Sequence, residues 1–195
     1  MIIYRPVKTN WLTQKYGLKN TNPLLLKSYN NMGLAGHTGF DFKANKGEHV
    51  YWNCDLDGEV IALSTDFKLG YGVTVLTKER DAVVKHRHWH FMALYCKIGQ
   101  ILKPGDLMGW ADSTGFSTGD HDHYDMKTQI LVNGVLKNEF QDNGYFGAVD
   151  PEPYYVNIFI LDYVMSMKRI EGLLAVIREM IKRIKENIAL LPKGR

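Results

Sequence analysis

Histidine and aspartate recur in this sequence at spacings that could hold a metal ion. The first such stretch, GHTGFDF, places His37 and Asp41 four residues apart. In an extended strand their side chains would lie ~13 Å apart, too far to share a metal whose ligand bonds are ~2 Å long. The chain would therefore have to turn back between them, and Gly36 and Gly39 make such a turn sterically easy. The HxxxD spacing taken alone also arises by accident.

The second stretch, HDHYDM, carries His121 and His123 on a segment that otherwise reads as a strand. Side chains at i and i+2 of a strand share a face, with roots about 6–7 Å apart, so two imidazoles can converge on one cation and its bound water. An exposed polar strand face would show the same alternation.

The third stretch, HRHWHF, places His86, His88 and His90 along one face of a single strand. A solvated polar face remains an alternative for His86 and His88. Together, the three stretches offer a His, an Asp and a His for a zinc ion, with further histidines for proton transfer. Three protein ligands and one open position are typical of a catalytic zinc site.

Short strands separated by Gly-rich turns occupy the region from Cys54 to Leu136, which predicts an antiparallel sheet. The runs EVIAL, VTVLTKE and AVVKHRHWHF form an expected meander, and LMGWAD is a further strand. Asn133-Gly134 lies between two apolar runs, the strongest short signal for a hairpin. Residues 1–50 read as loops around the sheet. The predicted fold class is mainly β, with a long C-terminal α-helix.

The segment VDPEPYY marks the expected domain boundary, because Pro151 and Pro153 disfavour both sheet and helix. We expect a β domain over residues 1–155 and an amphipathic heptad helix over residues 156–192. The helix follows from apolar residues spaced alternately three and four apart, as in the seam of a coiled coil. These are Ile160, Tyr163, Met167, Ile170, Leu174, Ile177, Ile181, Ile184, Ile188 and Leu191.

Additional apolar positions widen this stripe, which suits either packing on the β domain or a higher-order bundle. They are Leu161, Val164, Leu173, Val176 and Met180. Ile at the second seam position disfavours dimers, so self-association through residues 160–191 is expected to give a trimer or tetramer. Lying flat on an anionic membrane is a third alternative.

Composition limits the other classes of function. The chain has 195 residues, 45% hydrophobic and 23% charged, as in a globular protein with one main domain. Its net charge of +3 is unevenly distributed along the chain. Residues 155–195 carry eight Lys or Arg against four Asp or Glu, a net charge of +4, so the rest of the chain has a net charge of −1. No basic face accompanies the histidines, which argues against nucleic-acid binding. Cys54 and Cys96 lack metal or redox spacing and are predicted to be buried thiols.

We expect no transmembrane segment, because no run of ~20 apolar residues is present. The N-terminus also lacks the features of a secretory signal, so an extracellular or periplasmic role would require another route of export or a missing leader.

Over most of residues 11–155 the sequence resembles the lysostaphin and LytM endopeptidases, which cut bacterial peptidoglycan. GHTGFDF is similar to that family's first metal motif, and STGFSTGDHDHYDM is similar to its second. WHFMALYCKIGQILKPGDLMG resembles the intervening tract, in which a His nine residues before a Gly-Gln pair is catalytic; His90 stands nine before Gly99. VDPEPYY resembles the Pro-containing end. The resemblance implies a lysostaphin-like peptidase fold of the duplicated hybrid motif type.

Transferred residue by residue, the resemblance implies one zinc ion per chain, held by His37, Asp41 and His123. It implies that His121 acts as general base on a zinc-activated water. His90 would bind the developing oxyanion or share the base role. The implied substrate is a peptide bond in the cross-links or stem peptides of peptidoglycan.

The sequence departs from the family pattern near these residues. His88 stands where Tyr is usual, Asp120 where Pro is common, and Asp122 where Leu is frequent. None is a ligand, but a carboxylate at Asp122 would favour the charged form of His121. Tyr29 could match a family Tyr before the first motif, although the loop length leaves it outside the core site.

Two other hypotheses stand beside an active endopeptidase. One is a catalytically silent domain that binds cell wall or activates another enzyme, which would be expected to lack a ligand. The other, compatible with activity, makes the chain part of an assembly such as a bacteriophage tail tip, with other virion proteins as partners. The absence of a visible leader and the heptad tail favour this view, with release by lysis as the route to the wall.

Overall fold

The computed structural model describes residues 1–189 except residues 20, 67 and 80–81. Its strands are β1 Ile3–Arg5, β2 Leu12–Gln14, β3 Phe40–Lys43, β4 His49–Tyr51, β5 Gly58–Asp66, β6 Gly70–Glu79, β7 Ala82–Leu94, β8 Ile101–Leu102, β9 Leu107–Ala111, β10 His121–Val132, β11 Val135–Asn138 and β12 Tyr155–Phe159. Its helices are α1 Pro23–Asn31, the 3-10 turn η1 Glu152–Tyr154, and α2 Ile160–Ala189.

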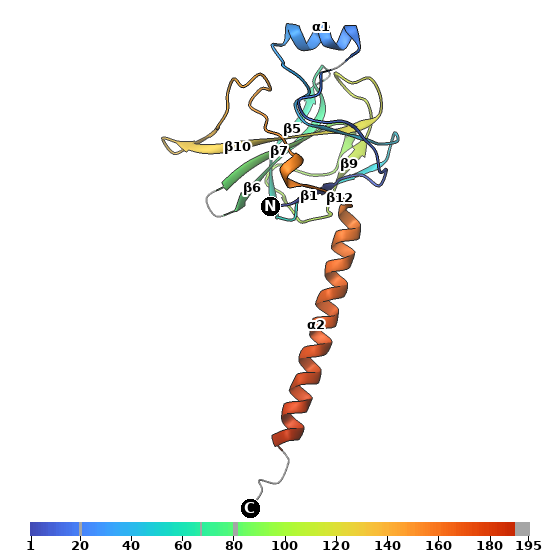
Figure 1. The fold of residues 1–195 in the computed structure, drawn as a ribbon, viewed down its shortest axis with the longest axis vertical. Coiled ribbons are helices and arrows are strands. Elements are labelled where there is room, and N and C mark those ends of the chain that lie inside the picture. Colours follow the sequence, from blue (N-terminus) through green and yellow to red (C-terminus); the bar gives the residue numbers. More distant parts are fainter. Residues whose placement is uncertain (20, 67, 80–81, 190–195) are drawn as a thin grey trace, which may run out of the picture. The chain divides into compact units, whose positions relative to one another are not determined.

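A ten-stranded sheet dominates the described part of the chain, with the order β2-β3-β10-β7-β6-β5-β8 (Figure 1). Strands β5, β6 and β7 form the expected antiparallel meander. The predicted hairpin also forms: β10 pairs with β11, and Asn133 and Gly134 both have positive φ, 52° and 78°. The expected fold class, an antiparallel sheet with a C-terminal helix, is confirmed.

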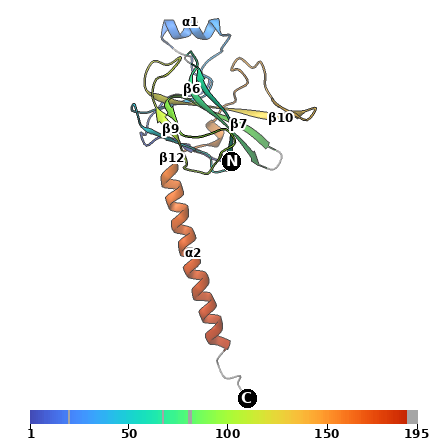
Figure 2. The same ribbon diagram turned by 180° about the vertical axis from the view of Figure 1, so that it is seen from behind.

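Residues 1–50 are more regular than the sequence predicts. Strand β2 pairs with β3 at the edge of the sheet, and β4 pairs with β9. The helix α1 was not expected, because its Asn-rich sequence PLLLKSYNN has only a short apolar stripe. Figures 1 and 2 show α1 standing beyond the ends of the sheet strands.

Large side chains fill the core on one face of the sheet. Phe40 and Phe42 of β3 and Tyr124 of β10 are fully buried, together with Trp52. Because strand residues alternate between faces, the neighbours of these residues on β3 and β10 point to the opposite face. The buried alternation therefore fixes which histidines and aspartates are available for a site. Cys54 and Cys96 are free, buried thiols, as predicted.

The C-terminal helix begins at Ile160, and its expected start at residue 156 is wrong. Tyr155–Phe159 instead forms β12, which pairs in parallel with β1. The chain divides into two compact units, Met1–Ile160 and Leu161–Arg195. The last seam residue, Leu191, and the expected end at residue 192 lie outside the described residues, as does the side chain of Ile188. None of the described helices has an apolar stretch suited to crossing a bilayer.

Candidate metal centre and active site

The pairing of β3 with β10 brings the two metal motifs of the sequence together. Asp41 of β3 lies directly opposite His123 of β10 in the antiparallel register. Directly opposed residues have their Cβ atoms about 4.5–5.5 Å apart on the same face, so the two side chains must meet. The Nδ1 atom of His123 lies 2.8 Å from Oδ1 of Asp41.

His37 reaches the same point from the loop before β3. Its Nε2 atom is 3.0 Å from Oδ1 of Asp41, so the chain turns back as the spacing required. The two glycines serve a different purpose from the one predicted, since neither has a positive φ. A Cβ atom on Gly39 would lie 2.0 Å from the carbonyl oxygen of Tyr124, and one on Gly36 would lie 2.6 Å from that of Gly17. Close backbone approach, not turn conformation, therefore requires glycine here.

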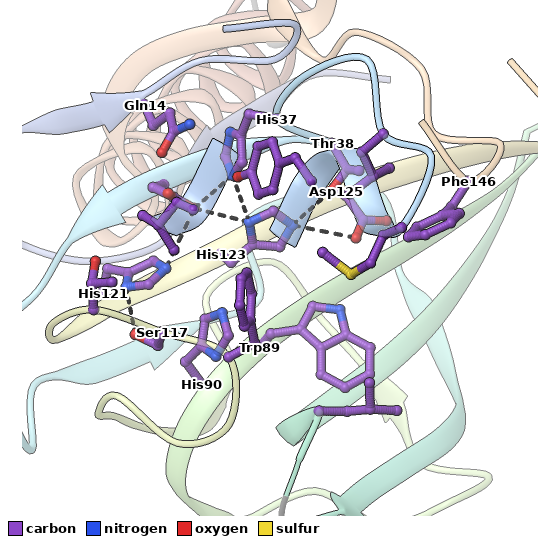
Figure 3. Close-up of a pocket in the computed structure, with 18 of the residues that line it drawn as sticks. Gln14, His37, Thr38, Trp89, His90, Ser117, His121, His123, Asp125 and Phe146 are labelled. Carbon is purple, nitrogen blue, oxygen red and sulfur yellow. Dashed lines mark hydrogen bonds and ion pairs between the residues drawn. The ribbon is translucent and has the colours of Figure 1, made fainter. Parts of the chain in front are cut away.

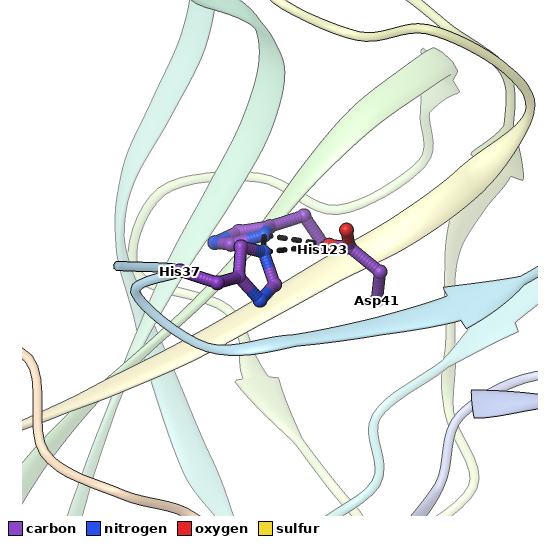
Figure 4. Close-up of side chains that lie close together, drawn as sticks. All are labelled: His37, Asp41 and His123. Carbon is purple, nitrogen blue, oxygen red and sulfur yellow. Dashed lines mark hydrogen bonds and ion pairs between the residues drawn. The ribbon is translucent and has the colours of Figure 1, made fainter. Parts of the chain in front are cut away.

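The donor atoms of His37, Asp41 and His123 all lie within 4.8 Å of one another (Figure 4). The remaining separation, between His37 Nε2 and His123 Nδ1, is 3.0 Å. In a tetrahedral zinc site with bonds of ~2.0–2.1 Å, donor atoms are about 3.3–3.4 Å apart. Two imidazole nitrogens and one carboxylate oxygen at these separations can hold zinc after shifts of a few tenths of an ångström.

Hydrogen bonds on the far side of each imidazole orient the two candidate ligands. Nδ1 of His37 donates to the carbonyl oxygen of Lys15 at 3.3 Å, which leaves the Nε2 lone pair facing Asp41. Nε2 of His123 lies 3.3 Å from Oγ1 of Thr38 and 3.5 Å from Oδ2 of Asp125, which leaves Nδ1 for the centre. These contacts select the tautomers that a metal ion needs.

The electrostatics of the cluster favour a bound cation. Burial alone would raise the pKa of Asp41, but hydrogen bonds from His121, His123 and His37 hold it well below its usual range. Burial disfavours the charged form of His123, yet hydrogen bonds to Asp125 and Asp41 outweigh it and raise its pKa to about 9. A positive charge is thus stabilised at the point where the three donor atoms meet.

His121 lies beside this cluster, on the same face of β10 as His123, as the alternation predicted. Its Nδ1 donates to the carbonyl oxygen of Gly119 at 2.7 Å, and its Nε2 is 3.4 Å from Oδ1 of Asp41. Burial opposes its charged form, but the Asp41 carboxylate prevails and raises the pKa of His121. The charged form of His121 is therefore favoured while the Asp41 carboxylate faces it.

His90 joins the site only because β7 bends there. Strict alternation would place it with His86 and His88, but His90 has a φ of 72°, and the pairing of β7 with β6 and β9 shifts register nearby. Its ring centroid consequently lies 4.7 Å from that of His121 (Figure 3). A histidine in the left-handed region is uncommon and is typical of functional sites.

The protonation of His90 differs from that of His121. Burial and the neighbouring rings of His121 and His123 lower the pKa of His90 to about 4, so it is neutral at pH 7. Its Nδ1 donates to the carbonyl oxygen of Thr114 at 2.6 Å. The Nε2 atom of the neutral ring therefore carries a lone pair and accepts hydrogen bonds.

The expectation that His86, His88 and His90 share one face is wrong. His86 and His88 are fully buried on the core side, so a solvated face is wrong as well. The imidazole of His86 bridges Thr77 Oγ1 and the Tyr124 hydroxyl. Nδ1 of His88 is 2.9 Å from Oδ2 of Asp122. Asp122 thus pairs with His88 on the core side rather than affecting His121 as expected.

The five predicted site residues all line one cavity, whose volume is about 240 Å³. They are His37, Asp41, His90, His121 and His123. Leu25, Tyr29 and Met32, at and just beyond α1, form one wall, and Trp89 and Phe116 belong to the other walls. Tyr29, left outside the predicted core site, therefore faces it. Burial, then the charge of Asp41, raises the pKa of the Tyr29 hydroxyl to about 12, so it remains a hydrogen-bond donor at pH 7.

Sequence reasoning missed Asp125, although a signal was available. Asp125 continues the i, i+2 series of His121 and His123 on β10, and alternation places all three on one face. Its carboxylate faces His123 (Figure 3) and is nearly fully buried. Arg87 of β7 holds it with two hydrogen bonds of 2.7 Å each.

The comparisons with known proteins agree with this geometry. The sequence profile described as Peptidase family M23 matches residues 35–137. Glycyl-glycine endopeptidase ALE-1 of Staphylococcus capitis is 34% identical over 116 residues, which cover 57% of this chain and 29% of that protein. Peptidoglycan DD-endopeptidase ShyB of Vibrio cholerae is 34% identical over 93 residues, which cover 48% of this chain and 21% of that protein. The chain thus spans under a third of these relatives.

The same fold occurs in a solved structure. The catalytic domain of lysostaphin from Staphylococcus simulans superposes with a TM-score of 0.54, covering 74% of this chain and 91% of that domain. At 23% sequence identity, this likeness concerns the arrangement of the strands.

Proposed function

Because this chain belongs to peptidase family M23, we propose that it is a zinc-dependent endopeptidase that hydrolyses peptide bonds in the cross-links or stem peptides of bacterial peptidoglycan. One observation carries the proposal. His37, Asp41 and His123 direct three donor atoms to one point, inside a cavity that two further histidines also line. The names of the two relatives, a glycyl-glycine endopeptidase and a peptidoglycan DD-endopeptidase, support the substrate class.

His37, Asp41 and His123 would hold one zinc ion. When bound, zinc supplies a Lewis acid that lowers the pKa of water and polarises a carbonyl group. His121 then acts as general base: it takes a proton from the attacking water at Nε2, while its Nδ1 donates to the carbonyl oxygen of Gly119, which stabilises the charged ring. It can later deliver this proton to the departing amine.

His90 and Tyr29 complete the proposed machinery. Nε2 of the neutral His90 accepts a hydrogen bond from the attacking water and so orients it, which assigns His90 to the base side of the reaction. The protonated Tyr29 hydroxyl is available as a donor to the developing oxyanion. The apolar walls of the cavity exclude competing water and strengthen these interactions.

A rival hypothesis is a catalytically silent domain that binds cell wall or activates another enzyme. A domain of this kind has no need for two oriented imidazoles next to a complete set of metal ligands. The Nδ1 atoms of His90 and His121 are both held by backbone carbonyl oxygens, which leaves both Nε2 atoms for chemistry. The arrangement therefore favours the enzyme.

Purified protein with suspended cell walls provides the test. We expect the suspension to clear, the activity to disappear with a strong chelator, and added zinc to restore it. His123→Ala should be inactive yet folded, with no zinc in metal analysis. The matched variant is His49→Ala, which changes an exposed histidine that does not line the cavity and should remain active.

Clearing that survives both the chelator and His123→Ala would exclude zinc chemistry. Wall binding without any released peptide would favour the silent domain. Mass spectrometry of the released fragments would identify which bond is cut.

We also propose that α2 joins several chains into a trimer or tetramer, a form suited to a structural assembly such as a bacteriophage tail. Among the described side chains of α2, ten large apolar residues are more than one-third exposed, including Ile170, Ile177 and Ile184 of the seam. In this proposal the enzyme reaches the extracellular or periplasmic side of the wall as part of a virion, or after lysis.

A further inference from the structure

A second cavity continues the candidate site along the same face of the sheet. Its volume is about 410 Å³, and it shares Leu69, Arg87 and Trp89 with the first cavity. The residues at its far end include Lys85, Lys127 and Asn138. The two cavities together form one groove that leads away from the candidate metal centre.

Three cations and one carboxylate line the floor of this groove. The register of β10 against β7 places Asp125 opposite Arg87 and Lys127 directly opposite Lys85. Arg87 is neutralised, because both oxygens of Asp125 accept its hydrogen bonds. Among the described residues, neither Lys85 nor Lys127 forms an ion pair. Like charges that face each other across a strand pair destabilise a sheet, so this pair carries a cost.

Burial increases that cost. Lys127 is only 7% exposed, and its Nζ donates to the carbonyl oxygen of Phe146. Burial, followed by repulsion from Arg87 and Lys85, outweighs the attraction of Asp125 and lowers the pKa of Lys127 to about 8. Burial and Arg87 also lower the pKa of Lys85. A lysine is rarely buried without a carboxylate partner, and an anionic ligand would supply the missing charge.

We propose that Lys85 and Lys127 form a subsite for a carboxylate of the peptide substrate. The inference rests on the proposed function, since it places the scissile bond at the centre formed by His37, Asp41 and His123. Lys127 follows His123 by four residues on β10, a distance of ~13 Å along a strand. An extended peptide advances about 3.3–3.6 Å per residue, so the recognised carboxylate lies three or four residues from the scissile bond.

The shape of the groove favours a peptide over a phosphate-bearing polymer. Leu63 lines the second cavity, which also contains the lysines, and Leu69 and Trp89 line both cavities. Apolar side chains beside paired cations suit an extended chain that carries both apolar side chains and one acid. A single carboxylate has two oxygens that accept charge-assisted hydrogen bonds, so one such group can interact with both ammonium groups.

Paired synthetic peptides test the proposal. Both members have the same sequence and cleavage point, but one carries a free carboxylate four residues from the scissile bond and the other its amide. We expect kcat/KM to be about 10- to 100-fold higher for the acid than for the amide. In Lys85→Met and Lys127→Met this ratio should fall toward one, whereas Lys127→Arg should retain it.

Lys103→Met is the matched control, because Lys103 pairs with Asp57 at the surface and lines neither cavity. Its ratio should equal that of the original protein. Thermal unfolding checks each variant. If Lys127→Met does not fold, the half-buried Lys85 still provides the test through Lys85→Met.

Binding to the full chain without metal separates this inference from the proposed function. With chelator present, the labelled acid should bind at least about 10-fold more tightly than its amide, and both lysine variants should abolish the difference. If the acid binds more tightly as expected but neither peptide is cleaved after zinc is added, the proposed function is refuted and the subsite is not. Cleavage with equal binding and equal kcat/KM for both peptides would overturn the subsite alone. Displacement by glycerol phosphate, without any advantage for the carboxylate, would overturn it in favour of a phosphate-bearing polymer.

Discussion

The carboxylate of Asp125 lies 3.5 Å from Nε2 of His123, on the side of the imidazole opposite to its candidate metal-binding atom, Nδ1. The two residues are neighbours on one face of β10, and Arg87 anchors the carboxylate from β7. A carboxylate behind a ligating histidine fixes the tautomer and the orientation of the ring. We therefore propose that Asp125 is a positioning residue for the candidate metal centre.

Replacement of Asp125 by Asn should weaken zinc binding by about 10- to 100-fold, because the amide no longer stabilises Nε2–H as a carboxylate does. Competition with a chromophoric chelator measures this affinity directly, independently of turnover. Asp57→Asn, which removes an exposed carboxylate paired with Lys103, should leave zinc affinity unchanged. Equal affinities for the two variants would contradict the positioning role.

Gly39→Ala should damage both stability and metal binding. The new Cβ would lie 2.0 Å from the Tyr124 carbonyl oxygen, so β3 must move away from β10 and take Asp41 with it. We expect a loss of about 1–3 kcal/mol in the free energy of unfolding, together with weaker zinc binding. Gly172→Ala in α2 adds the same methyl group with no atom within 4 Å, and it should favour the helix by roughly 0.5–1 kcal/mol. A fully stable Gly39→Ala protein that binds zinc normally would disprove the close-approach argument.

His86 should make the stability of the protein depend on pH. Burial, then the proximity of His88, lowers the pKa of His86 to about 3, against 6.5 in the unfolded chain. Above pH 6.5 both states leave the ring neutral. As the pH falls from 6.5 toward 3, only the unfolded chain gains this proton, so stability is lost at up to about 1.4 kcal/mol per pH unit.

The variant His86→Gln removes this proton uptake. Urea unfolding of the metal-free protein at pH 7 and pH 5 should show a smaller decrease for the variant, by roughly 2 kcal/mol. His49→Gln, at an exposed position, should follow the original protein. If His86→Gln loses as much stability as the original between the two pH values, His86 is not the buried neutral group described.

Self-association through α2 predicts a particle several times heavier than the 22.4 kDa chain at micromolar concentration. Light scattering measures this mass. The double variant Ile170→Lys/Ile177→Lys, which places charges in the seam, should give a monomer. Met165→Lys should leave the oligomer intact, because Met165 is exposed but lies outside both the seam and the widened stripe. A 22 kDa particle for the unaltered chain would refute the oligomer.

Local sequence patterns predicted much of the fold and part of the site. The meander, the Asn133-Gly134 hairpin and the shared face of His121 and His123 follow from strand alternation and turn chemistry, which depend on near neighbours in the chain. The same alternation implied the position of Asp125. It also gave wrong results: it placed His90 on the same face as His86 and His88, and it offered no sign of α1.

The sequence by itself determined which residues could do chemistry and which strand faces would carry them, because side-chain type and the period of two are local properties. Only the tertiary structure decided that Asp41 meets His123 across 82 residues, since strand register depends on how whole faces pack into one core. The tertiary structure also decided that the His90 side chain points toward His121. The surrounding strands and the Thr114 carbonyl hold His90 in a left-handed backbone conformation that an isolated histidine would not favour.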